Sequence, residues 1–156
     1  MFARHFETVV SSIDSPELLF ARLDDQERLS RHMMKSSWMM GGGRMTFSFD
    51  RDRGKEVGSI ITMAARVFGI SLFAREKIVE RTPPWSKAWE TLGEPRLLVI
   101  GSYRMGFRIE RQGPGSSLIV FIDYDLPVGL LTIVGRLFGP IYARWCTMRM
   151  AKDAQS

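Results

Sequence analysis

The sequence predicts an α+β fold in which a curved antiparallel sheet of about seven strands wraps a long C-terminal helix, with two short helices after the first strand. Between residues 45 and 125, stretches of alternating apolar and polar residues recur, and this two-residue period is typical of half-buried strands. Glycine and proline separate these stretches, as expected for turns. Over residues 129–151, apolar residues recur every three or four positions, which indicates an amphipathic helix.

The composition favours one globular domain spanning residues 1–156. Hydrophobic residues make up 45% of the chain and charged residues 25%, which is unlike disordered or disulfide-rich proteins. Cys146 is the single cysteine, so no intramolecular disulfide can form. The first residues lack the apolar segment of a signal peptide, and residues 127–143 are too few for a membrane span and include Arg136. We therefore expect a cytoplasmic protein.

The chain is basic, with a net charge of +5 and a sequence pI near 9.8. Such a charge attracts anionic partners in general. The basic residues are scattered, however, and no run of five or more occurs, whereas nucleic-acid binders concentrate them in a patch. We expect a solvated arginine-rich surface and no nucleic-acid partner, and peripheral contact with an anionic membrane stays an open alternative. The oligomeric state is not indicated.

The N-terminal region predicts a strand followed by two short helices. Residues 5–13 are rich in strand formers. Ser15 suits the N-cap position of a helix over residues 16–23, because its hydroxyl can accept a hydrogen bond from a free backbone N–H. Asp24, with Glu27 three residues later, resembles a capping box and predicts that a second helix begins there.

Turn residues define the remaining strands. Gly69 separates two apolar runs that form a hairpin, and Pro83 with Pro84 ends the second run. Residues 93–95 and 113–115 predict two further turns. The predicted strands cover residues 45–50, 58–68, 70–81, 87–92, 97–110 and 117–125.

The C-terminal helix is predicted over residues 129–151. Pro140 lies inside it and predicts a kink near residues 136–140, because proline lacks an N–H and clashes with the preceding turn. The side chains expected to face the core are Leu130, Val134, Leu137, Ile141, Trp145 and Met148.

The sequence predicts no cofactor and no metal site. The run from Gly41 to Gly43 breaks any helix, but the lysine and helix of a phosphate-binding loop do not follow it. His5 and His32 have no recognisable metal-ligand or catalytic-triad spacing. Asp123 and Asp125 alternate with an inward residue, so we expect both on the outer, solvated face of their strand.

The order of these elements resembles the START-like superfamily, also called SRPBCC or helix-grip, which includes polyketide cyclases, Bet v 1-like plant proteins and lipid-transfer domains. The resemblance covers nearly the whole chain and is carried by residues 12–17, by 76–84 followed by Trp89 and Glu90, and by 121–127. It implies a cavity between sheet and terminal helix that admits a sterol, fatty acid, isoprenoid or polyketide in different members.

The inward positions supply candidate residues for binding a hydrophobic ligand. Buried tyrosine hydroxyls, such as those of Tyr103 and Tyr124, need hydrogen-bond partners and could use a ligand. The ten methionines suit a pliable apolar pocket, although they could equally fill gaps in an ordinary core. The ligand-binding candidates are Trp38, Phe47, Met63, Trp89, Tyr103, Met105, Phe107, Tyr124, Val134 and Phe138.

Candidates for catalysis are few. Glu76, Tyr103 and Arg104 could polarise a carbonyl group, which is much of what a polyketide cyclase has to do. Cys146 is expected to be a buried hydrophobic side chain. The main hypothesis is therefore binding or transport of a small hydrophobic molecule, such as a lipid, isoprenoid or polyketide. The alternatives are a polyketide cyclase/dehydrase-like enzyme and a membrane-peripheral or protein-interaction module.

Overall fold

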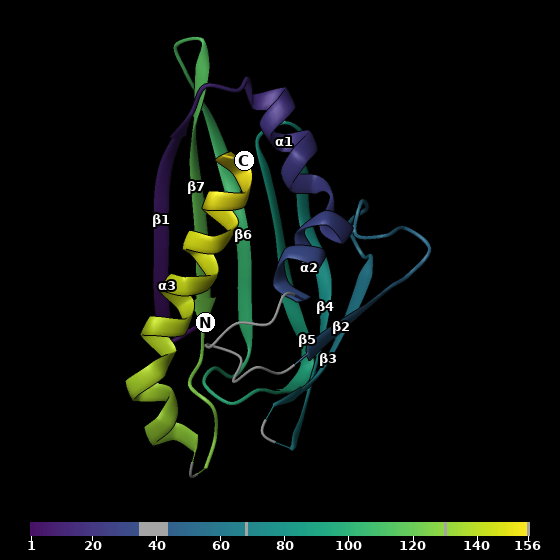
Figure 1. The fold of residues 1–156 in the computed structure, drawn as a ribbon, viewed down its shortest axis with the longest axis vertical. Coiled ribbons are helices and arrows are strands. Elements are labelled where there is room, and N and C mark those ends of the chain that lie inside the picture. The colour runs from purple at the N-terminus through teal and green to yellow at the C-terminus, as the bar shows by residue number, and fades with distance from the viewer. Residues whose placement is uncertain (35–43, 68, 130, 156) are drawn as a thin grey trace.

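Over the residues that the structure describes, the fold is a seven-stranded antiparallel sheet with three helices on one face (Figure 1). The computed structural model describes residues 1–34, 44–67, 69–129 and 131–155, so Leu130, Trp38 and Gly41 to Gly43 lie outside the described residues. The strand order is β1-β7-β6-β5-β4-β3-β2. The elements are β1 Arg4–Ser12, α1 Pro16–Asp24, α2 Gln26–Met34, β2 Arg44–Phe49, β3 Ile60–Val67, β4 Ile70–Thr82, β5 Ser86–Arg96, β6 Tyr103–Gln112, β7 Gly115–Tyr124 and α3 Leu131–Gln155.

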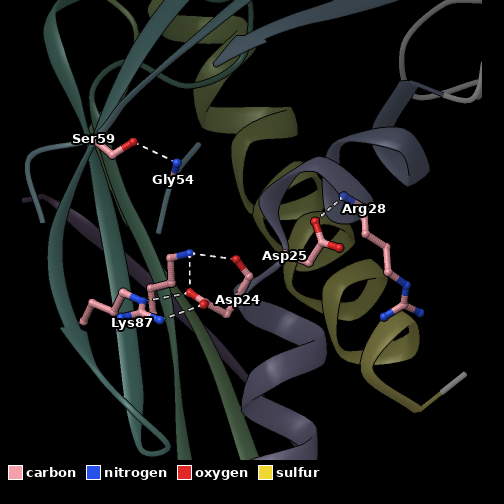
Figure 2. Close-up of polar contacts among 7 residues, drawn as sticks. Asp24, Asp25, Arg28, Gly54, Ser59 and Lys87 are labelled. Atoms are coloured by element: carbon pink, nitrogen blue, oxygen red, sulfur yellow. Dashed lines mark hydrogen bonds and ion pairs between the residues drawn. The ribbon is translucent and has the colours of Figure 1, made fainter. Parts of the chain in front are cut away.

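The two short helices lie where the sequence predicts them, but the second cap differs. Ser15 caps α1, and its hydroxyl accepts a hydrogen bond from the Leu18 N–H. At α2 the cap is Asp25, whose carboxylate accepts from the Arg28 N–H at 3.0 Å (Figure 2). The assignment of Asp24 as this cap was wrong, because the Asp24 carboxylate binds two basic side chains of the sheet instead.

The predicted hairpins are confirmed, and one predicted turn is wrong. Gly69 and Gly113, both with positive φ, occupy the β3–β4 and β6–β7 turns. Residues 93–95 do not end a strand, because β5 continues to Arg96. Gly93 has a φ of +65°, and the register between β4 and β5 shifts there, so this segment is an irregularity within a long strand.

The predicted strand over residues 97–110 begins only at Tyr103. Residues 97–102 instead form a connection that packs against α3. Gly101 donates its N–H to the Asp125 carbonyl, and the Val99 carbonyl lies where side chains at Gly135 and Gly139 of α3 would be. Of the apolar residues of this connection, Ile100 is buried and Leu97, Leu98 and Val99 are half-buried, although none of them belongs to the sheet.

Helix α3 is long, as predicted, but it buries a different side. The residues packed inward are small, among them Gly135, Gly139 and Ala143, and they let the helix approach the sheet and the 97–102 connection closely. Leu137 and Ile141, predicted to face the core, are 64% and 51% exposed. Of the other predicted core side chains, Val134 and Trp145 are half-buried and Met148 is exposed.

Pro140 lies within α3, which continues on both sides of it; the kink stays a prediction. None of the helices in the described ranges combines the length and the apolar character that crossing a membrane requires.

Candidate functional site

The structure encloses a cavity of about 320 Å³ between the sheet, α2, the 97–102 connection and α3. Its walls are almost entirely apolar. Phe73 and Phe138 line it. Phe138 of α3 is 52% exposed, so the cavity reaches the surface beside this side chain. The other lining residues are Gln26, Leu29, Ser30, Met45, Phe47, Phe49, Ile61, Met63, Ala64, Ala65, Val67, Leu72, Ala74, Glu76, Trp89, Leu97, Leu98, Val99, Ile100, Tyr103, Met105, Ile122, Tyr142, Cys146, Arg149, Met150 and Asp153.

One part of the cavity wall, hereafter the polar end, is formed by Glu76, Trp89 and Tyr103 on three adjacent strands. The Tyr103 hydroxyl donates a short hydrogen bond to Glu76 Oε1, and the Trp89 side chain also hydrogen-bonds this carboxyl group. Burial raises the pKa of Glu76 from 4.5 to about 7, because a charged carboxylate is poorly solvated there. The polar end therefore changes its charge close to neutral pH.

Helix α3 places a second polar pair beside this wall. Tyr142 and Cys146, one turn apart, share a side-chain hydrogen bond, and both line the cavity. Burial raises the pKa of the Cys146 thiol to about 12, so the thiol stays protonated and is a poor nucleophile. Burial and the nearby Glu76 carboxyl raise the pKa of Tyr103 well above its usual value. Around neutral pH, Glu76 is thus the titrating member of this group.

Gln26, the first residue of α2, brings a buried amide to the cavity. It is 5% exposed, and its Oε1 atom has no hydrogen-bond partner. The loop after β2 packs on its side chain, and Gly54 permits this contact because any Cβ there would lie 2.8 Å from Gln26 Cγ. The Gly54 N–H is held by Ser59 Oγ at 2.7 Å (Figure 2). Gln26 thus offers an acceptor to a ligand donor group.

A buried ion cluster holds the end of α1 and the start of α2 against the sheet (Figure 2). The Lys87 side chain is fully buried, and its Nζ donates to Asp24 Oδ1 at 2.8 Å and to the Asp24 carbonyl at 3.1 Å. Arg81 donates two hydrogen bonds to the same carboxylate, at 3.0 and 2.9 Å. Burial raises the pKa of Asp24, but the two basic groups together outweigh this and hold it below its usual value. The cluster thereby fixes where α2 covers the cavity.

The structure brings six of the ten ligand-binding candidates together around the cavity: Phe47, Met63, Trp89, Tyr103, Met105 and Phe138. Phe107 faces the same side of the sheet but packs against Phe20 of α1, with ring centroids 5.7 Å apart. Tyr124 is buried against Gly139, and Val134 is half-buried outside the cavity lining. Trp38 lies outside the described residues.

The three catalytic candidates do not lie together in the structure. Glu76 and Tyr103 meet at the polar end, whereas Arg104 points to the other face of β6, where its Nη2 lies 3.1 Å from Glu80 Oε2. The alternation that turns Tyr103 inward turns Arg104 outward, so the assignment of Arg104 to the pocket was wrong. Sequence reasoning missed Gln26, Tyr142 and the apolar residues of the 97–102 connection as cavity residues. The spacing of Tyr142 from Cys146 and Phe138, four residues each way, was the signal that could have identified one of them.

Asp123 lies on the outer face of β7, opposite Arg104, and its carboxylate contacts His5 Nδ1 at 2.5 Å. Asp125 follows the end of this strand, and its carboxylate accepts from the Ala3 N–H. Among the residues that the structure describes, no group of three or more His, Cys, Asp or Glu side chains is arranged so that it could hold a metal ion.

No protein-family model matches the sequence, and no curated protein matches it. Solved structures do resemble it. Protein TTHA0849 from Thermus thermophilus has a TM-score of 0.69 at 11% identity, with 97% of this chain and 94% of that chain covered. Ginseng major latex-like protein 151 from Panax ginseng has a TM-score of 0.64 at 10% identity, covering 99% and 97%. The di-domain ARO/CYC StfQ from the steffimycin biosynthetic pathway has a TM-score of 0.70 at 12% identity, covering 97% of this chain and 49% of that chain. The strand order, the helix positions and these likenesses establish that the chain has the Bet v 1-like, helix-grip fold.

Proposed function

We propose that this chain binds or transports a small hydrophobic molecule, such as a lipid, an isoprenoid or a polyketide, in the cavity between the sheet and α3. The observation that carries the proposal is the apolar cavity of about 320 Å³ that reaches the surface beside Phe138. Concave, mostly apolar sites of this size with a few convergent polar groups are typical of small-molecule binding. The likeness to a two-domain aromatase/cyclase structure also supports a ligand of this class.

The polar groups of the cavity restrict the ligand further. Glu76, when protonated, can donate one hydrogen bond and accept others, and Gln26 Oε1 is a buried acceptor. A ligand with an apolar body and one hydroxyl or carbonyl group would satisfy these atoms. A permanently anionic head group would be repelled once Glu76 ionises.

The first experiment is native mass spectrometry of the purified protein, followed by organic extraction and identification of any bound small molecule. An apolar compound bound at near one per chain is the expected result. A protein that carries none, and that binds no member of a broad lipid and polyketide panel, would contradict the proposal.

Filling the cavity is expected to weaken binding of an apolar, uncharged fluorescent probe such as Nile red. Ala65 on β3 lines the cavity, so Ala65→Phe should raise the probe's Kd about tenfold by occupying volume that the ligand needs. Thr62→Phe, on the opposite face of the same strand, is the matched control and should leave the Kd unchanged. Equal effects of the two variants would locate the probe outside the cavity.

A second candidate function is catalysis on the bound molecule, as in a polyketide cyclase or dehydrase. It is favoured by the Glu76 carboxyl group, whose pKa of about 7 suits proton transfer, hydrogen-bonded to Tyr103. Mass spectrometry of poly-β-carbonyl compounds incubated with the protein tests for turnover. If the protein is an enzyme of this kind, Tyr103→Phe should retain binding and lose turnover; absence of turnover with the unmodified protein leaves binding as the function.

A further inference from the structure

The outward side of α3, hereafter the α3 outer face, carries large apolar side chains in an unusual position. Ile133, Leu137 and Ile141 follow one another four residues apart and are 67%, 64% and 51% exposed. They point outward because the opposite side of the helix is packed through glycine and alanine. A row of exposed aliphatic residues on one helix face is typical of an interaction surface.

The charges on this helix all have one sign until its last turns. From Leu126 to Lys152 the sequence contains three arginines and one lysine but no aspartate or glutamate. Arg136 and Arg144 are exposed and lie within one turn of the aliphatic row. An apolar helix face bordered by basic residues is the pattern of helices that lie in the interface of an anionic membrane.

The α3 outer face is continuous with the mouth of the cavity. Phe138, next to Leu137, is 52% exposed and also lines the cavity. In Figure 1 the first turns of α3, at the lower left, extend beyond the ends of β1 and β7. A flat surface could therefore approach these turns without meeting the neighbouring strands.

We propose that the α3 outer face docks this protein onto membranes that contain anionic phospholipids. A second copy of the chain fits this surface less well. In a two-fold symmetric dimer the same patch meets itself, so Arg136 and Arg144 would approach the same arginines of the other copy. An anionic membrane supplies both an apolar layer for Ile133, Leu137 and Ile141 and phosphates for the arginines. The proposal concerns the outer surface and does not depend on what the cavity binds.

Co-sedimentation of the full chain with lipid vesicles tests the proposal. We expect binding to phosphatidylcholine vesicles containing about 30% phosphatidylglycerol and much weaker binding to phosphatidylcholine alone. The double variant Arg136→Gln/Arg144→Gln should lower the partition coefficient about 25-fold, at about fivefold for each arginine. Raising the salt from about 0.1 M to about 0.5 M should weaken binding of the unmodified chain in the same direction.

A matched pair of double variants distinguishes binding through the α3 outer face from non-specific binding to vesicles. Leu137→Glu/Ile141→Glu should abolish vesicle binding with no change in Tm, because both side chains are exposed. Ile13→Glu/Val57→Glu adds the same charge at residues 95% and 59% exposed elsewhere and should retain most of the binding. Binding lost equally in both pairs, or absent from the unmodified chain, would overturn the proposal. The proposal would also be overturned if light scattering finds a dimer that Leu137→Glu/Ile141→Glu dissociates and the unmodified protein does not bind vesicles.

Discussion

Replacing Asp24 with alanine is expected to lower the free energy of unfolding by about 3–5 kcal/mol, because it leaves the Lys87 ammonium group buried without its anion. Lys87 is 0% exposed, and its two hydrogen bonds both go to Asp24, one of them to the carboxylate that the substitution removes. For a chain of this length, the loss corresponds to a fall in Tm of about 10 °C. Urea unfolding followed by circular dichroism measures the change.

Two controls show whether the cost arises from the orphaned charge. Asp25→Ala removes a neighbouring carboxylate that caps α2, and a lost cap costs only about 1 kcal/mol. Adding Lys87→Met to Asp24→Ala removes the unpaired ammonium group, so the double variant should be more stable than Asp24→Ala alone. If the effects of the two substitutions on the free energy of unfolding were additive, the unpaired, buried charge of Lys87 would not be the cause of the destabilisation.

The general architecture could be predicted from sequence because it follows from local chemistry. Strand alternation placed Phe47 and Met105 on the inner face, and positive-φ glycines at Gly69 and Gly113 fixed two hairpins. The packing of α3 could not be predicted in the same way. The first half of α3 carries apolar residues on nearly every side, so periodicity did not identify the buried side. The glycines face inward because they permit the close approach to the Val99 carbonyl.

The candidate site could be predicted only where the direction of a side chain follows from alternation along a single strand. Tyr103 and Glu76 lie inward by alternation, but their contact depends on strands that pair through β5. Phe107 lies on the correct face and still misses the cavity, because α1 occupies that part of the sheet. Residues 97–102 looked like a strand because they are apolar, and only the tertiary structure shows that they cover the cavity instead. The Asp24–Lys87 pair joins residues 63 apart in sequence, and no local pattern indicates it.

Replacing Glu76 with glutamine is expected to flatten the dependence of stability on pH between about pH 5 and pH 8. In the folded chain burial raises the pKa of Glu76 from 4.5 to about 7, so the folded state holds a proton that the unfolded state releases. The stability associated with this proton is full below pH 4.5 and is lost as pH rises through 7. Integrated from pH 5 to pH 8, the loss is about 2–3 kcal/mol. Glutamine cannot ionise, and its carbonyl can still accept the Tyr103 hydrogen bond.

Urea unfolding of both proteins at several pH values measures this difference. Glu76→Gln should match the unmodified chain near pH 5 and exceed it by about 2–3 kcal/mol at pH 8. The side chains beside Glu76 do not interfere, because burial keeps Tyr103 and Cys146 protonated throughout this range. Glu80→Gln, on the same strand but with a side chain 44% exposed, is the matched control and should keep the original profile. Parallel profiles for Glu76→Gln and the unmodified chain would mean that Glu76 is charged when folded, which would favour ligands with a cationic group over neutral ones.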